Sequence, residues 1–297
     1  MTQNRSSFLA TSADTMQLLP SFSRRKSRGF TSKQKQLMLE LLPKLTLDIV
    51  RPSIFDSCAP DHGATCTIAD SRLNNTTSKE SSTLEIGYLE IGFGCGEHIL
   101  ELSSLYPNEL VIGCEVFLNG VVSLLAALDA NPRSNIAIYI DDARKLIEIL
   151  PTNSVGTTYV LFPDPWPKSR HRKRRLISEG FLHSLARVSK KLIVATDHEV
   201  YAGHMMIALN RYVAPSGYRQ SNNCMEWQGS LSEHHELTPD HSEACRHHIV
   251  SVSANLHTYT HQVFKNLDEC VANNVATRYA RKALYDGRAV HYFEVIF

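Results

Sequence analysis

A carboxylate, an indole ring and a run of cations follow one another in residues 161–175. This segment reads Leu-Phe-Pro-Asp-Pro-Trp-Pro-Lys-Ser-Arg-His-Arg-Lys-Arg-Arg and contains Asp164 and Trp166. The apolar run Thr158–Phe162 is short and β-branched, which predicts a buried strand. The prolines that follow it predict a stiff, extended loop. A carboxylate, an aromatic plane and a basic run after a strand suit a nucleic-acid base with its phosphates.

The basic residues of this segment are expected to bind phosphates. A polyanion responds to a local cluster of charge, so the formal net charge of +1 does not exclude nucleic acid. Trp166 could stack on a base or anchor the loop by apolar contact, and both interpretations stay open. The cluster consists of Lys168, Arg170, Arg172, Lys173, Arg174 and Arg175.

A glycine-rich stretch, Leu89-Glu-Ile-Gly-Phe-Gly-Cys-Gly, lies between a strand-like and a helix-like segment. Gly92, Gly94 and Gly96 allow a tight turn and close approach of the backbone to a ligand. The spacing is GxGxG rather than the GxGxxG of dinucleotide sites, and Glu97 would repel a phosphate at the helix start. The stretch therefore favours a ligand without phosphates, such as S-adenosylmethionine.

Three acids at successive strand ends strengthen this interpretation. Glu115 follows the second strand-like segment at the spacing where a carboxylate accepts ribose hydroxyls. Asp142 and the backbone amide of Ala143 could read an adenine edge, although Asp142 could also simply cap a helix. Glu90 could face the cationic methionine end of the ligand.

Strand-like and helix-like segments alternate between residues 83 and 209, which predicts an α/β fold with a mostly parallel central sheet and helices on both faces. The strand-like segments are Leu84–Ile91, Leu110–Cys114, Ile136–Ile140, Thr158–Phe162 and Leu192–Ala195, and the helix-like segments are Glu97–Leu105, Phe117–Asp129, Ala143–Leu150, Ser178–Ser189 and Glu199–Leu209.

Composition divides the chain into three parts. Residues 1–50 form a basic arm and a helix, of which about the first 22 are expected to be disordered. Residues 51–82 are a polar insertion, and residues 83–297 form the main domain. Within that domain, the polar, histidine-rich residues 217–275 are interpreted mainly as an insertion.

Helix and strand signals also lie near the two ends of the chain. The stretch Thr31-Ser-Lys-Gln is a helix-start signal, and the apolar period after it continues to about Leu45. Near the C-terminus, Leu267–Leu284 is helix-like and Ala289–Phe297 is strand-like.

The remaining candidate groups are given ordinary structural roles. The histidines and the cysteine between residues 234 and 248 match no zinc spacing, so no metal site is predicted. His98 is expected on a helix surface. The seven cysteines lack paired spacing, which predicts free thiols in a reducing cytoplasm. No apolar run is long enough to cross a membrane.

These motifs resemble those of the bacterial tRNA (guanine-N7-)-methyltransferase family, which has a Rossmann-like class I S-adenosylmethionine-dependent methyltransferase fold. The resemblance covers most of Ser23–Val213 and the C-terminal end. The matching motifs are Pro163-Asp-Pro-Trp-Pro-Lys with His171-Arg-Lys-Arg-Arg-Leu (the most specific), the glycine stretch, Gly113-Cys-Glu-Val, Ala195-Thr-Asp-His-Glu-Val-Tyr and the basic Ser23-Arg-Arg-Lys-Ser-Arg.

The resemblance implies methyl transfer from S-adenosylmethionine to N7 of guanosine 46 in the variable loop of tRNA. It implies cofactor contacts at Glu90, Glu115, Asp142 and Asp164, and substrate contacts at Lys168, Asp197, Thr277, Arg278 and Tyr279. We expect no obligatory protein partner, and a monomer or a homodimer. The family motif ends in Glu where this chain has Ala280, and the segment between Asp197 and Thr277 is longer than usual.

The implied chemistry needs no strong base, because guanine N7 carries a free lone pair. Placement in line with the methyl group matters most. A carboxylate can stabilise the positive charge that develops on the base. We assign this role, and hydrogen bonding to the N–H edge of guanine, to Asp164 and Asp197, with Asp164 as the catalytic residue.

Three alternatives remain at this point. An exocyclic-amine methyltransferase for nucleic acids has a related motif at the same strand end. A nicotinamide-dependent dehydrogenase is disfavoured by the glycine spacing. A catalytically weakened RNA-binding homologue is suggested by Ala280.

Overall fold

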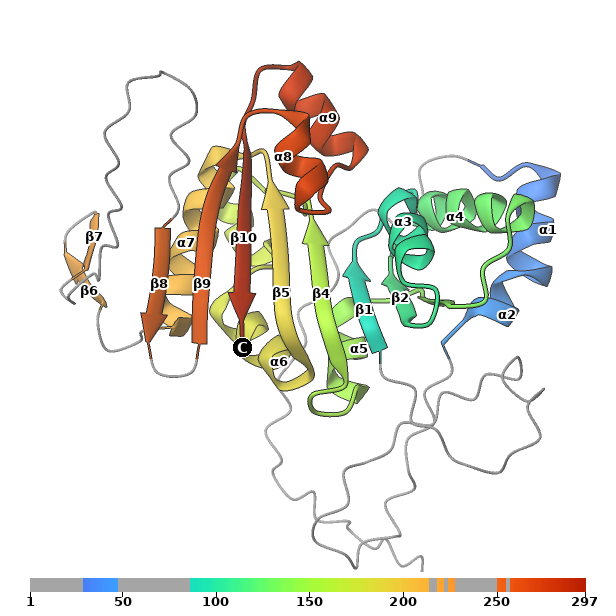
Figure 1. Ribbon diagram of the computed structural model, residues 1–297, viewed down its shortest axis with the longest axis horizontal. Coiled ribbons are helices and arrows are strands. Elements are labelled where there is room, and N and C mark those ends of the chain that lie inside the picture. The colour runs from blue at the N-terminus through green and yellow to red at the C-terminus, as the bar shows by residue number, and fades with distance from the viewer. Residues whose placement is uncertain (1–28, 48–85, 214–217, 222–223, 228–249, 255–256) are drawn as a thin grey trace, which may run out of the picture.

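The computed structural model describes residues 29–47, 86–213, 218–221, 224–227, 250–254 and 257–297 (Figure 1). The basic arm at residues 23–28, the polar insertion at 51–82 and the histidine-rich residues 234–248 lie outside the described residues.

A central sheet runs through the molecule. Within the described residues it has eight strands in the order β3-β2-β1-β4-β5-β10-β9-β8. The strands β1 to β5 are parallel, whereas β10 is antiparallel to both β5 and β9, and β9 to β8. Their bounds are β1 Ile86–Ile91, β2 Leu110–Cys114, β3 Ile136–Tyr139, β4 Val155–Leu161, β5 Ser189–Thr196, β8 Val250–Ala254, β9 His257–Phe264 and β10 Val290–Ile296; β6 Tyr218–Ser221 and β7 Cys224–Trp227 form a separate hairpin.

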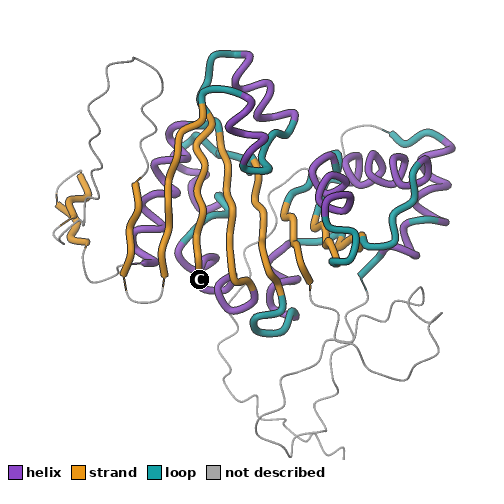
Figure 2. The backbone as a smooth tube through the Cα atoms, in the orientation of Figure 1, coloured by secondary structure: helices purple, strands orange, loops and turns teal. Residues whose placement is uncertain are grey.

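Helices cover both faces of the sheet, as Figures 1 and 2 show. Alternate strand residues point to opposite faces: on β4, Val160 joins the apolar cluster beneath α5, α6 and α7, whereas Tyr159 and Leu161 join the cluster beneath α3, α4 and α9. The bounds are α1 Ser32–Glu40, α2 Leu42–Leu45, α3 Glu97–Leu105, α4 Leu118–Ala130, α5 Ala143–Ile149, the 3₁₀ helix η1 Ser169–Arg174, α6 Glu179–Val188, α7 Glu199–Val213, α8 Leu267–Ala272 and α9 Arg278–Tyr285.

The predicted α/β fold with a mostly parallel sheet is confirmed. The helix-start signal is also confirmed, because Thr31 forms a capping box with Gln34. The residues Cys95, Cys114 and Cys270 are free thiols. Within the described residues, none of the helices combines the length and the apolar content that crossing a bilayer requires.

Two predictions for the C-terminal third are wrong. The interpretation of residues 217–275 as mainly an insertion fails for β8, β9 and α8, which belong to the domain. On β9, the partly exposed Thr258, Thr260 and Gln262 alternate with the buried Tyr259 and His261, so composition alone misreads this strand. The single helix predicted over Leu267–Leu284 is divided into α8 and α9. Asn274 is in the left-handed region at φ 55°, and Thr277 caps a new helix.

Candidate active site

The sheet reverses its strand order between β1 and β4. The chain leaves β1 toward β2 and β3, and it leaves β4 toward β5. In an open α/β sheet, such a switch point creates a crevice at the carboxyl ends of the strands. The glycine stretch follows β1 and the Asp164 loop follows β4, so the two motifs predicted to do chemistry flank the same crevice.

The glycine stretch needs its glycines for backbone conformation and for space. Gly92, Gly94 and Gly96 have φ values of 78°, 58° and 86°, a region that side chains disfavour. A Cβ on Gly96 would lie 2.8 Å from Leu124 Cδ1, whereas a Cβ on Gly92 would meet nothing within 4 Å. The backbone is therefore packed closely on one side and open at Gly92, where a ligand can approach.

The carboxylate of Glu115 is held by backbone amides. Gly94 N–H donates to Oε2 over 2.8 Å, while the amides of Val116 and Phe117 donate to Oε1 over 2.8 and 2.9 Å. Burial raises the pKa of Glu115 although these amides oppose the shift, and the nearby Glu90 charge raises it further. Glu115 thus fixes the glycine stretch and keeps acceptor capacity for ligand hydroxyls.

Glu90 is 3% exposed, and its Oε2 atom lies 3.1 Å from Nδ1 of His98. The contact has the distance of an ion pair without the alignment of a hydrogen bond, so Oε2 has no aligned donor among the described residues. The prediction that His98 lies on a helix surface is wrong, because the ring is only 4% exposed. Its position in the first turn of α3 turns it inward, beneath the glycine stretch.

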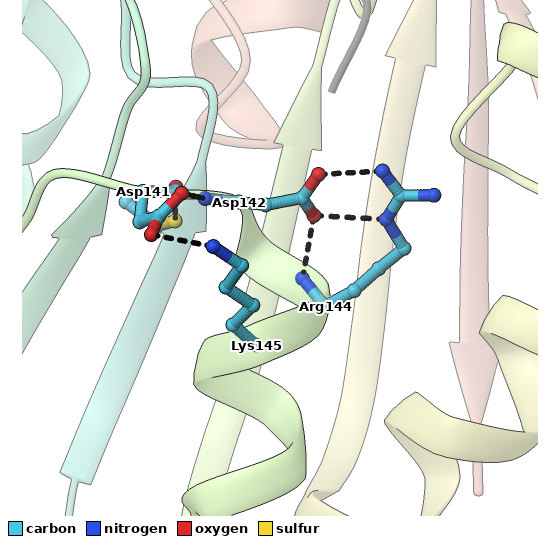
Figure 3. A network of polar contacts seen from close by, with 5 residues as sticks. Asp141, Asp142, Arg144 and Lys145 are labelled. Carbon is cyan, nitrogen blue, oxygen red and sulfur yellow. Dashed lines mark hydrogen bonds and ion pairs between the residues drawn. The ribbon is translucent and has the colours of Figure 1, made fainter. Parts of the chain in front are cut away.

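Asp142 is a helix cap and an ion-pair partner. Its Oδ1 accepts a hydrogen bond of 3.0 Å from the amide of Arg144 at the start of α5, and the Arg144 guanidinium makes two further contacts of 2.8 and 2.5 Å (Figure 3). Burial opposes ionisation, but the contacts with Arg144 prevail and lower the pKa of Asp142. Lys145 pairs with the neighbouring Asp141 over 2.9 Å. The sequence signal for a cap at Asp142 is confirmed, while its role toward a cofactor stays a prediction.

The loop that carries Asp164 is held in a strained conformation. It is extended, as its prolines predict, and two aromatic residues at its ends, Phe162 and Trp166, have positive φ values of 53° and 42°. Bulky residues adopt this region only when the surroundings enforce it, typically at functional sites. Partial burial raises the pKa of Asp164.

Arg175 is one of the residues that hold the Asp164 loop in this conformation. Its side chain is 6% exposed, and its guanidinium donates to the carbonyl oxygens of Pro165 and Trp166 over 2.9 and 3.3 Å. The guanidinium also lies over the ring of Tyr201. The prediction that Arg175 binds phosphate is therefore wrong, because its donors serve the loop itself.

The other cations of the run remain available to a polyanion. Lys168, Arg170, Arg172 and Lys173 are exposed, the first just before η1 and the others on it. Trp166 meets the guanidinium of Arg174 at 5.0 Å from the ring centroid and packs edge-on against His171. These contacts support the anchoring interpretation of Trp166 and leave base stacking untested.

The predicted substrate motif lies across the crevice from the Asp164 loop. Thr277 caps α9 by accepting from the amide of Ala280, and Ala280 itself is fully buried. Arg278 pairs with Glu97 at the start of α3. The Tyr279 ring stacks on Phe162 with centroids 6.0 Å apart, and its hydroxyl would lie 3.9 Å from a Cβ on Gly94.

Tyr279 lies between the two halves of the site. The negative charges of both Glu115 and Asp164 raise its pKa, after burial and Cys95, and Arg278 opposes them. The structure therefore brings together the glycine stretch, Glu115, Asp164 and Tyr279, as the sequence predicts.

Asp197 lies just after β5, at the same edge of the sheet, and forms an ion pair with Arg288. Arg288 also contacts Asp286 over 2.9 Å. This partner was missed from the sequence because Arg288 is distant along the chain and belongs to no motif. The register of β10 beside β5, which pairs His291 with Thr196, brings the two segments together.

The residues at the crevice fit S-adenosylmethionine. The molecule is cationic at its sulfonium and amino groups and lacks phosphate. The buried acids Glu90 and Glu115 lie beneath the glycine stretch, and open space lies next to Gly92. A phosphate at the start of α3 would meet Glu97, which is already paired with Arg278.

Comparisons with known proteins agree with this geometry. A family model described as "Putative methyltransferase" matches residues 85–248. A protein from Brucella anthropi named tRNA (guanine-N(7)-)-methyltransferase is 35% identical over 220 residues, which are 71% of this chain and 86% of that protein. A protein of the same name from Paramagnetospirillum magneticum is 36% identical over 61% of this chain and 70% of that protein.

Solved structures with a similar fold are more distant in sequence. The 16S rRNA methyltransferase KamB is 16% identical, with a TM-score of 0.42 over 71% of this chain and 88% of that one. An antibiotic-related methyltransferase is 15% identical, with a TM-score of 0.37 over 71% and 87%. The strand order, rather than these values, defines the fold of this chain.

Proposed function

The chain belongs to the bacterial tRNA (guanine-N7-)-methyltransferase family, and we propose that it methylates N7 of guanosine 46 in the variable loop of tRNA. One observation supports this proposal most directly. Tyr279 stacks on Phe162 at the start of the Asp164 loop, on the substrate side, and its hydroxyl lies next to Gly94 in the glycine stretch, on the cofactor side. Donor and acceptor would thus meet beneath one aromatic ring.

The cofactor half of the site would hold S-adenosylmethionine, which supplies an electrophilic methyl group on a sulfonium. Glu115 would accept hydrogen bonds from the ribose hydroxyls, and Glu90 would face the cationic methionine end. The backbone of Gly92, Gly94 and Gly96 would allow the ligand to approach closely. Asp142 and the amide of Ala143 would lie at the adenine.

The substrate half would place guanine N7 in line with the methyl group. The N7 lone pair forms the new bond, so no residue needs to remove a proton first. Asp164 would accept from the N–H edge of guanine and stabilise the positive charge that develops on the base. The strained loop serves this role because it holds Asp164 in position before the substrate arrives. Asp197 and the motif Thr277–Tyr279 would complete the contacts to the nucleotide.

The exposed cations Lys168, Arg170, Arg172 and Lys173 would hold the tRNA backbone. Attraction to phosphate is not specific for sequence, so this surface gives affinity, while the crevice selects the base. N7 must be accessible for reaction, which favours a loop nucleotide over a paired duplex. We place the reaction in the cytoplasm and assign no obligatory protein partner, with the chain acting as a monomer or a homodimer.

The test is methyl transfer from labelled S-adenosylmethionine to unmodified tRNA, followed by identification of the methylated nucleoside. We expect N7-methylguanosine, and we expect no transfer to the same tRNA carrying adenosine at position 46. Methylation of an exocyclic amine would overturn the proposed chemistry. Methylation of a guanosine elsewhere would overturn the proposed position.

A further inference from the structure

His98 is buried where α3 packs against β1 and β4, the two strands that precede the glycine stretch and the Asp164 loop. Its ring lies 3.1 Å from the Glu90 carboxylate on β1. The ring also packs edge-on against Tyr159 on β4, with centroids 4.7 Å apart. Glu90 and Tyr159 are register partners in the sheet, so His98 covers the point where β1 and β4 meet. This point lies directly beneath the crevice.

We propose that His98 is a positioning residue that orients Glu90 toward the cofactor. This inference rests on the proposed function, because it takes Glu90 as a cofactor contact. His98 lies outside the motifs that carry the family resemblance. His98 acts through its neighbours and touches neither the methyl group nor the base.

Electrostatics support a charged ring at this position. Burial disfavours the imidazolium, but Glu90 prevails, with help from Glu101 on α3 and the Asn274 backbone, and raises the pKa of His98. The Tyr159 phenol on β4, whose ring packs against His98, stays neutral because burial raises its pKa strongly. An imidazolium attracts the Glu90 carboxylate, whereas a neutral ring would not.

Two amide substitutions test the contact with Glu90. The side-chain nitrogen of Asn matches imidazole Nδ1, the atom that faces Glu90, and that of Gln matches Nε2. We expect His98→Gln to lose the Glu90 contact and to raise the dissociation constant for S-adenosylmethionine by about 10-fold, the effect of one interaction with a charged group. We expect His98→Asn to keep cofactor affinity within about 3-fold, because a donor remains next to Glu90. Calorimetry measures both affinities.

The matched control is His183→Gln, an exposed histidine on α6, which contacts α5 and α7 rather than α3. It should leave the affinity for S-adenosylmethionine unchanged. A wild-type affinity of the His98→Gln variant would overturn the inference, as would equal losses of affinity in the Gln and Asn variants. If wild-type protein transfers no methyl group to tRNA, the proposed function fails first, and the two failures are distinguishable.

A measurement on the unsubstituted protein covers the case in which the variants do not fold. The ring signals of His98 in NMR spectra of histidine-labelled protein should report a charged imidazole at neutral pH. Addition of S-adenosylhomocysteine should shift these signals, because Glu90 would gain a second cationic partner. Signals that do not shift when the ligand is added would overturn the inference.

Discussion

The phenol ring of Tyr279 stacks on Phe162, with ring centroids 6.0 Å apart and planes inclined by 28°. Phe162 begins the loop that carries Asp164, and Tyr279 belongs to α9, more than a hundred residues later. The contact joins the two sides of the crevice and places an aromatic lid over the glycine stretch. Tyr279 is 51% exposed, so little additional apolar surface meets water if the ring moves away from Phe162.

Loss of this lid should affect substrate use more than stability. We expect Tyr279→Ala to lower kcat/KM for tRNA by about 10-fold or more, since aromatic stacking contributes about 1–3 kcal/mol per base. Tyr279→Phe should keep most of the activity because the ring remains. Steady-state kinetics with unmodified tRNA measure both variants. Equal activity of the alanine variant and the wild type would contradict the assignment.

Asp164→Asn should abolish most of the methyl transfer. A single group that stabilises developing charge is typically responsible for a factor of about 100 or more in rate. The tRNA dissociation constant should change by less than about 3-fold, because the cations beyond the loop are intact. Single-turnover rates and filter binding separate the two effects. A variant with the wild-type rate would remove Asp164 from the mechanism.

The same carboxylate predicts a pH dependence. Partial burial raises the pKa of Asp164 above its usual value. Because catalysis needs the ionised form, the rate should decline as the pH falls toward this raised pKa. The Asn variant should lack this acid limb in its residual rate. A pH profile measured at saturating substrates tests the sign.

Arg172 and Arg175 should respond differently to substitution, although they are three residues apart. Arg172→Ala should weaken tRNA binding and reduce the slope of log affinity against log salt by about one, with little effect on stability. Arg175→Met should destabilise the protein by about 2–3 kcal/mol, because two partly buried carbonyl groups lose a charged donor. Salt-dependent binding and urea denaturation give the two quantities. A phosphate-binding Arg175 would instead show the salt effect.

Substitutions of Asp142 can separate helix capping from cofactor binding. Asn also caps helices well, so Asp142→Asn should retain stability, while Asp142→Ala should lose about 1 kcal/mol. If Asp142 also meets the adenine, the alanine variant should bind S-adenosylmethionine several-fold more weakly than the asparagine variant. Equal affinity of the two variants would leave Asp142 with structural roles only. Calorimetry with S-adenosylmethionine decides the question.

A partly buried histidine pair should limit stability in acid. The Nε2 atom of His261 lies 3.1 Å from Nδ1 of His291, and burial and the His291 ring lower the pKa of His261 to about 4. Below about pH 6.5, His261 binds a proton in the unfolded chain but not in the folded chain, so stability falls as the pH falls. The loss should be about 2 kcal/mol between pH 7 and pH 5.

His261→Gln should reduce this loss, because Gln keeps a hydrogen-bonding amide and cannot titrate. The free energy of unfolding at the two pH values measures the difference. Exposed His183→Gln serves as the control and should keep the wild-type pH dependence. An unchanged dependence in the His261→Gln variant would assign the acid sensitivity to other groups, His291 first among them.

Local patterns in the chain were sufficient for the strands β1 to β5 and the helices α3 to α7, although not for η1. Apolar periodicity identified these strands and α-helices, and turn chemistry located the Gly92–Gly96 stretch and the proline loop. The edge of the sheet that carries Glu115, Asp164 and Asp197 was also predictable. Parallel strands joined by helices must bring their carboxyl ends to one edge.

Contacts between distant segments were not predictable in this way. The burial of His98 depends on the packing of α3 against β4, and the stacking of Tyr279 on Phe162 depends on how α9 lies over the crevice. The role of Arg175 depends on a turn that directs its guanidinium back to Pro165 and Trp166. Charge alone made it look like its exposed neighbours in the run. A side-chain type limits the contacts that a residue can make, whereas burial and the partner that closes each contact arise only when the folded chain excludes water.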